Sequence, residues 1–212
     1  MALARFADIA AQPHPPLDEL ALALAAEFRE VDADAALAHL DLLGEEVRRA
    51  PGDDLDALVD VLGRRYGFVG DAERYDDPAN SMLDIVLERR SGLPILLSVV
   101  YVEVARRAGL ELAGVGLPAH YVVARFDPPP AVLLDPFDRG ARIDVAPSDH
   151  LRPWTAHETA LRMLNNLVGS YVRRSDLGRA IRAAEMRLEL PVAGAEAQAL
   201  GAELHALRAR LN

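Results

Sequence analysis

The sequence predicts an α+β protein in which helices predominate. Apolar residues recur at helical spacing through the first half of the 212-residue chain, alternate with a period of two after Gly109, and return to helical spacing from His157. The hydrophobic fraction of 51% owes much to alanine and leucine, whereas aromatic residues make up only 5%, which favours helix. We expect one domain over residues 1–150 and a helical extension over residues 155–212.

Two helices that meet near Gly92 organise this prediction. Asn80 or Ser81 can cap the first helix, and Gly92 can end it. Pro94 suits the first turn of the second helix, because its missing N–H costs nothing there. This second helix is apolar on nearly every side for two turns, so we expect its N-terminal amides to lie inside the protein. Ser98 is the one hydroxyl nearby, and by itself it is best explained as a core serine bonded to its own backbone.

The helices before the sheet are predicted at residues 17–28, 34–49, 54–66, 81–91 and 94–108. Four short strands are predicted at residues 112–117, 119–126, 132–137 and 141–145, with Gly, Pro and Asp at their joints. A small antiparallel sheet packed against the second central helix follows from this order.

The hairpin across the loop 127–130 brings a histidine and an aspartate together in two of three registers. If Phe126 pairs with Ala131, Val122 lies opposite Asp135, and His120 is the diagonal neighbour of Asp135. A register shifted by two residues puts His120 directly opposite Asp135, and a shift of one puts them on opposite faces. Apolar residues at every second position after His120 indicate that this face is the core side. Such a pair suits a general base, but it also occurs for structural reasons alone.

Composition excludes several classes of function. The net charge of −10 argues against nucleic-acid binding. All 23 basic residues are arginine and cysteine is absent, so Schiff-base chemistry, disulfides and thiol nucleophiles are excluded. No two histidines show ligand spacing on one element, so neither a metal nor another cofactor is expected. The longest apolar run has ten residues and no secretory signal opens the chain, so we expect a cytoplasmic protein without a membrane partner.

A series of short motifs occurs in a characteristic order. The series is Gly67-Phe, Tyr75, Asn80-Ser81, Gly92-Leu-Pro-Ile95, Ser98, Gly114-Val-Gly-Leu-Pro118, His120 and Asp135-Pro-Phe137. Over most of residues 17–145 it resembles the bacterial SirB-type group of the transglutaminase-like superfamily. Residues 161–191 resemble one tetratricopeptide repeat, of the kind that commonly follows this core.

The resemblance implies a papain-like core in which a central helix carries a catalytic cysteine at its N-terminus and packs on a sheet that supplies histidine and aspartate. Pro94 stands where the cysteine would be, and His120 and Asp135 match the other two residues. The resemblance therefore implies a triad without its attacking atom.

Two functional hypotheses follow. The leading one is a pseudoenzyme that binds a protein or peptide, in part through the C-terminal helices; His120 and Asp135 are then remnants of the triad. Its expected binding residues are Asn80, Pro94, Ile95 and Tyr121. The alternative is a hydrolase or acyl-transfer enzyme in which Ser98 or Ser91 is a relocated nucleophile beside His120 and Asp135. Position argues against Ser98, because one helical turn moves it about 6 Å from the mouth of the site.

Overall fold

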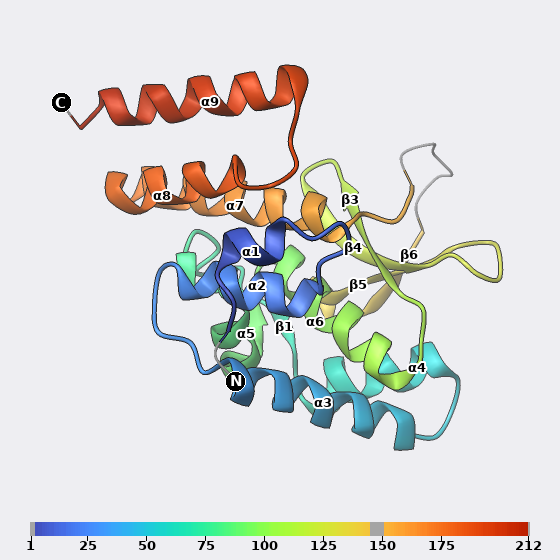
Figure 1. Ribbon diagram of the computed structural model, residues 1–212. Coiled ribbons are helices and arrows are strands. Elements are labelled where there is room, and N and C mark those ends of the chain that lie inside the picture. The colour runs from blue at the N-terminus through green and yellow to red at the C-terminus, as the bar shows by residue number, and fades with distance from the viewer. Residues whose placement is uncertain (1–2, 145–150, 212) are drawn as a thin grey trace.

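The computed structural model describes residues 3–144 and 151–211. Its α-helices are α1 (Phe6–Ala10), α2 (Leu17–Ala26), α3 (Ala33–Arg49), α4 (Asp54–Val59), α5 (Leu83–Arg89), α6 (Pro94–Ala108), α7 (Ala156–Arg173), α8 (Leu177–Arg187) and α9 (Gly194–Ala209). Its strands are β1 (Val69–Gly70), β2 (Ser91–Gly92), β3 (Ala113–Leu117), β4 (His120–Arg125), β5 (Val132–Asp135) and β6 (Ala141–Ile143). The predicted α+β class is confirmed: helices surround α6, and a small antiparallel sheet lies to one side (Figure 1).

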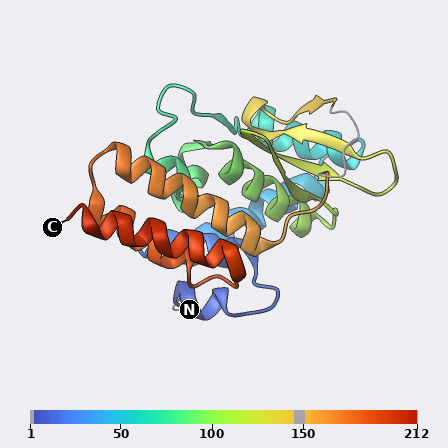
Figure 2. The same cartoon turned by 90° about the horizontal axis from the view of Figure 1, so that it is seen from above.

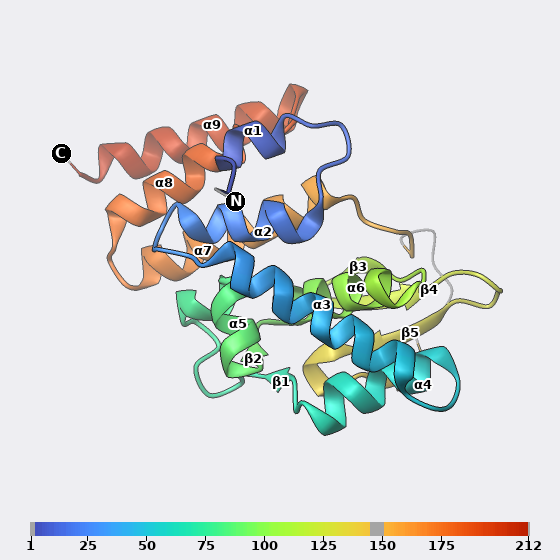
Figure 3. The same cartoon turned by 60° about the horizontal axis from the view of Figure 1, so that its bottom comes forward.

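Helix α6 is the centre of the fold, as its sequence predicts. Every residue from Pro94 to Tyr101 is buried, and Gly109 ends the helix with a left-handed φ of 85°. Helix α3 packs along one side of α6 and strand β4 along another, while α2, α5 and α7 add further contacts (Figure 3). The main hydrophobic core therefore forms around this helix.

The four-stranded sheet has the order β3-β4-β5-β6, with every neighbouring pair antiparallel. Arg125 pairs with Val132, which is the register predicted from pairing Phe126 with Ala131. Asp135 therefore lies one residue pair beyond the β4–β5 ladder, opposite Val122 and at the end of the ladder nearer to His120. Of the three registers that the sequence left open, the structure has the first, in which His120 is the diagonal neighbour of Asp135.

The predicted core side of the sheet is wrong. Tyr121 and Val123 belong to the main core together with the residues of α6. Val122 and Ala124, which alternate with His120, join a second, smaller apolar cluster on the other face. All four of these side chains are buried, because both faces of β4 are covered.

Several boundaries differ from prediction because of local backbone contacts. The helix predicted at 54–66 is α4 followed by a π-helical turn, Asp60–Arg65. That turn contains Gly63, whose missing Cβ would lie 2.1 Å from the carbonyl oxygen of Arg139. The helix predicted at 81–91 is a 3-10 turn, Pro78–Ser81, followed by α5; it stops before Gly92 because β2 pairs in parallel with β1.

Two strands are shorter than predicted. The strand predicted from residue 119 begins at His120, because Ala119 occupies the β3–β4 turn with a left-handed φ of 58°. The strand predicted at 132–137 ends at Asp135, where the 3-10 turn Pro136–Asp138 begins. Strand β6 ends at Ile143, and the predicted end of this strand at Val145 lies outside the described residues.

A buried ion network joins α2 to α6. The guanidinium of Arg107 donates to Asp18, Glu103 and Asp41 at 2.6–2.7 Å, and Arg106 donates to Glu103 and Asp18. Burial, with the charge of Asp18, raises the pKa of Glu103. Burial opposes ionisation of Asp18 as well, but the hydrogen bond from Arg107 holds the pKa of Asp18 below its usual value. Arg107 thus neutralises two carboxylates that are each 3% exposed.

The C-terminal helices pack on the side of the molecule away from the sheet. Figure 2 shows α7, α8 and α9 on one side of the molecule and the sheet on the other. Helix α7 and helix α8 pack against each other and contribute to the main core, whereas α9 contacts mainly α8. A capping box starts α7: Thr155 Oγ1 accepts from the N–H of Glu158, and Glu158 accepts from the N–H of Thr155. Arg152 also binds Glu158, and these bonds lower the pKa of Glu158 to about 2.

Candidate functional site

The structure brings His120 and Asp135 into direct contact. His120 Nε2–H donates to Asp135 Oδ2 over 2.8 Å, and the other carboxylate oxygen of Asp135 accepts from the N–H of Phe137 over 2.9 Å. Because a carboxylate can only accept, the neutral imidazole carries its proton on Nε2. Its Nδ1 has no hydrogen-bond partner among the described residues. The ring is 30% exposed, so Nδ1 is the atom that this couple offers to a ligand.

A row of aromatic rings joins this couple to the start of α6. The ring of Phe137 lies edge-to-face with His120 (6.4 Å between centroids) and with Tyr75 (6.1 Å). The ring of Phe137 also packs directly on the backbone of Gly70. A Cβ at this position would lie 2.3 Å from the ring, so no residue larger than glycine fits here. Gly70 pairs with Gly92, two residues before the first residue of α6. Sequence reasoning quoted Tyr75 and Phe137 in the motif series but assigned them no role.

The N-terminus of α6 is buried and carries no side-chain cap. Leu93 is the N-cap residue, and its own N–H donates to the carbonyl of Asn80 over 3.2 Å. Pro94 has no N–H, and Ile95 is 1% exposed. The side chain of Asn80 donates to the carbonyl of Arg74 over 2.7 Å, while its buried Oδ1 has no hydrogen-bond partner in the described structure. The first position of α6, which the resemblance assigns to the nucleophile, therefore holds a proline ring.

Two hydroxyls lie deeper on the same face of α6 as Pro94. Ser98 and Tyr101 follow it by four and seven residues, and both are fully buried. Within the described residues neither hydroxyl has a hydrogen-bond partner, so the expected bond from Ser98 to its own backbone is not formed. Burial raises the pKa of Tyr101, and the charge of Asp135 adds to that shift.

The two serines considered as nucleophiles are not bonded to the imidazole. Ser98 Oγ makes no hydrogen bond to His120. Ser91 lies in β2 and pairs with Val69, and the described structure contains no hydrogen bond between Ser91 and His120. The geometry therefore provides His120 with a carboxylate partner, but neither Ser98 nor Ser91 is placed for the imidazole to activate.

Tyr121 lies apart from the other predicted binding residues. Its hydroxyl bonds to Thr159 of α7 over 2.8 Å, and its ring is edge-to-face with Trp154 at 5.5 Å. Arg162 of α7 lies over both rings and donates to the carbonyl of His120 over 2.9 Å. Sequence reasoning missed Arg162, since no motif or spacing connects it to a residue 42 positions earlier.

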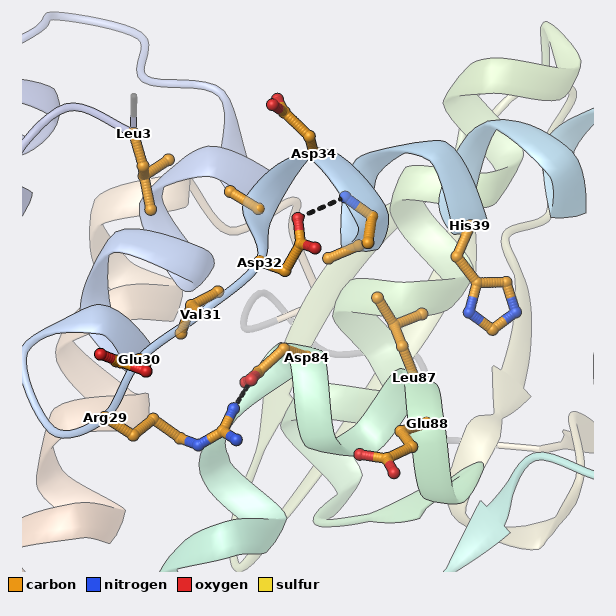
Figure 4. A pocket seen from close by; sticks show the side chains of 13 residues that line it. Leu3, Arg29, Glu30, Val31, Asp32, Asp34, His39, Asp84, Leu87 and Glu88 are labelled. Carbon is orange, nitrogen blue, oxygen red and sulfur yellow. Dashed lines mark hydrogen bonds and ion pairs between the residues drawn. The ribbon is translucent and has the colours of Figure 1, made fainter. Parts of the chain in front are cut away.

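A cavity of about 1070 Å³ lies elsewhere, between α5 and the connection from α2 to α3 (Figure 4). Its lining includes five carboxylates, and one of these forms an ion pair with Arg29. The five are Glu30, Asp32, Asp34, Asp84 and Glu88. This lining suits cationic rather than anionic groups, but none of the predicted site residues takes part in it.

The described residues contain no cluster of three or more histidine or acidic side chains arranged to hold a metal ion. In the same part of the chain, no helix combines the length and the apolar character that crossing a bilayer requires.

Comparison with known proteins places the chain in a family. Residues 17–152 match the transglutaminase-like superfamily. The chain belongs to this superfamily. The His–Asp couple, the start of α6 and the sheet all lie within the transglutaminase-like domain, whereas α7, α8 and α9 lie after it.

UPF0162 proteins and F-box only protein 21 are similar in sequence to part of this chain. A UPF0162 protein of Xylella fastidiosa is 34% identical over 153 residues, which cover 63% of this chain and 54% of that protein. A UPF0162 protein of Pseudomonas aeruginosa is 36% identical over 122 residues, covering 55% and 45% of the two chains. F-box only protein 21 of Mus musculus is 31% identical over 105 residues, which cover 46% of this chain and 17% of that protein. The chain spans about half the length of the UPF0162 proteins it matches. No solved structure matches it.

Proposed function

We propose that this protein is a non-catalytic, SirB-type transglutaminase-like domain that binds a protein or peptide segment. One observation carries the proposal: a proline occupies the first position of α6, while the His120–Asp135 couple is intact at 2.8 Å. Members of a catalytic triad act as a unit, and loss of the nucleophile alone removes most of the rate acceleration. The couple then serves as a ligand contact.

The surface beside the couple has the chemistry of a peptide contact. Tyr75 is 47% exposed, and its ring continues through Phe137 to His120 as a row of three aromatic groups. Aromatic rings provide contact area at little cost in conformational entropy, and Nδ1 of His120 can accept a hydrogen bond from a peptide amide. Together they favour an extended peptide with at least one large apolar side chain.

The proposal assigns the last part of the chain to partner binding. Residues 155–212 form a tetratricopeptide-like extension in this reading, with α7 and α8 as the paired helices of one repeat. The antiparallel packing of these two helices supports it. The alternative of an enzyme with a relocated serine has no comparable support, because Ser98 Oγ is buried and makes no bond to His120.

A peptide phage library panned on the intact chain tests the proposal, followed by fluorescence anisotropy with the selected peptides. We expect micromolar binding that weakens at least tenfold in Tyr75→Ala. Leu42→Ala, which removes an equally exposed apolar side chain from α3, should leave the affinity unchanged.

A parallel screen with fluorogenic ester and amide substrates and with amine-incorporation reporters completes the test. We expect no turnover above that of the His120→Ala variant. Turnover that disappears in His120→Ala would overturn the proposal, and so would the failure of every selected peptide to depend on Tyr75.

A further inference from the structure

His120 stands at a weakly paired end of its strand. It is the first residue of β4, directly after Ala119 in the turn, and it pairs only with Leu117 at the tip of the β3–β4 hairpin. The ladder between β4 and β5 begins at Val123, three residues further along. The carbonyl of His120 also accepts from Arg162 over 2.9 Å, and the same guanidinium donates to the carbonyl of Leu117 over 3.3 Å, so one side chain binds both residues of the pair that closes the hairpin.

The guanidinium of Arg162 is itself held in place. It lies 5.7 Å from the centroid of the Tyr121 ring and 5.8 Å from that of the Trp154 ring. Thr159, one turn before Arg162 on α7, bonds to the hydroxyl of Tyr121. Trp154 packs on the bare backbone of Gly116, where a Cβ would lie 2.0 Å from the indole. A cation here has to lie over two rings and donate hydrogen bonds to two carbonyls. The planar guanidinium of arginine does both, whereas the ammonium of lysine is a compact charge without that planar fork.

From these contacts we infer that Arg162 is a positioning residue for the His120–Asp135 couple. The side chain comes from α7, beyond the region that matches the superfamily, and it fixes the backbone from which the imidazole projects. The diagonal contact between His120 and Asp135 lies outside the β4–β5 ladder, so a shift of the hairpin tip would open it. The importance of Arg162 for ligand binding rests on the proposed function. Its role in positioning His120 does not.

The tautomer of His120 gives a direct test. Asp135 holds the imidazole proton on Nε2, and the ¹⁵N chemical shifts of a histidine ring distinguish that tautomer from the Nδ1–H form. The spectra are recorded above neutral pH on the intact chain, with the His120 signals assigned by their loss in His120→Gln. Asp135→Asn sets the full size of the change, and Arg179→Gln, on α8, is the matched control.

We expect Arg162→Gln to move the His120 tautomer ratio by at least half of the change seen in Asp135→Asn. Arg162→Lys, which keeps the charge but not the paired donors, should give a smaller change in the same direction. If Arg162→Gln does not fold, the lysine variant decides the question.

A folded variant at Arg162 that leaves the His120 signals as in the parent chain would overturn the inference, and so would an equal change in Arg179→Gln. Failure of the proposed function would be seen elsewhere, in peptide binding or in turnover by the parent chain. The two failures are therefore distinguishable.

Discussion

Replacing Pro94 by cysteine tests whether the start of α6 faces the imidazole. The chain has no cysteine of its own, so the ultraviolet absorbance of a single introduced thiolate can be titrated without interference. Proline at this position restricts the unfolded chain, so Pro94→Cys should cost about 0.4–1 kcal/mol of stability and leave the fold intact. The new thiol would lie at a helix N-terminus without a side-chain cap, and under the proposed arrangement it faces the imidazole of His120, whose Nδ1 has no hydrogen-bond partner among the described residues.

The expected size of the effect follows from this placement. A free thiol has a pKa of about 8.5, and a helix N-terminus with a neighbouring imidazolium lowers it to about 6.5 or below. At about pH 6 the ionised fraction then rises from roughly 0.3% to roughly 24%, which is a gain of about 75-fold in thiolate. His120→Ala in the same background removes the imidazole but keeps the helix dipole, so most of this gain should disappear.

The comparison has a clear negative outcome. If the thiol titrates identically with and without His120, the imidazole does not face the first residue of α6. Residue 94 and the His120–Asp135 couple would then not form one site. Ala199→Cys, at an exposed position in the middle of α9, supplies the value for an ordinary surface thiol.

Three further changes test the packing that holds the site. Arg107→Ala leaves the buried carboxylates of Asp18 and Glu103 with the 59% exposed Arg106 as their remaining guanidinium partner and should cost about 3 kcal/mol in urea unfolding. Arg106→Ala leaves Arg107 in place and should cost less than about 1 kcal/mol. Gly116→Ala should cost about 1–3 kcal/mol and shift the fluorescence of the single tryptophan, because the new methyl overlaps the indole; Gly201→Ala, in open space on α9, should stabilise by about 0.4–1 kcal/mol. The pKa of Glu158, about 2, lies below the ordinary 4.5, so its contribution is complete above about pH 4.5 and is lost as the pH falls towards 2. Glu158→Gln should therefore destabilise by about 1 kcal/mol or less at neutral pH and by much less near pH 2, and an equal loss at both pH values would contradict this assignment.

Local signals in the sequence were sufficient for the central helix and for the existence of the hairpin, and they narrowed its register to three alternatives. Pro94 and Gly109 mark the two ends of α6, and the turn residues of loop 127–130 between two apolar runs mark the hairpin of β4 and β5. These features depend on near neighbours in the chain, so a single sequence contains them. The contact of His120 with Asp135 followed directly from the register.

Other features depend on contacts between distant segments and left no such signal. Residues from Tyr121 to Ala124 are all buried, so alternation could not show which face of β4 meets α6. The parallel pairing of β1 with β2 involves two residues on each side, too few for any periodicity. Arg162 looks like an ordinary helix residue until α7 is placed against the hairpin.

The packing of α7 has a practical consequence for anyone who divides this protein by similarity alone. A fragment cut at the end of the matched region, residue 152, would lose Met163, Leu164 and Leu167, all of which are 0% exposed in the main core. Their removal would leave an apolar wall open to water, and we expect such a fragment to aggregate. The region that matches the superfamily is thus shorter than the main hydrophobic core, and expression studies should retain α7 and α8.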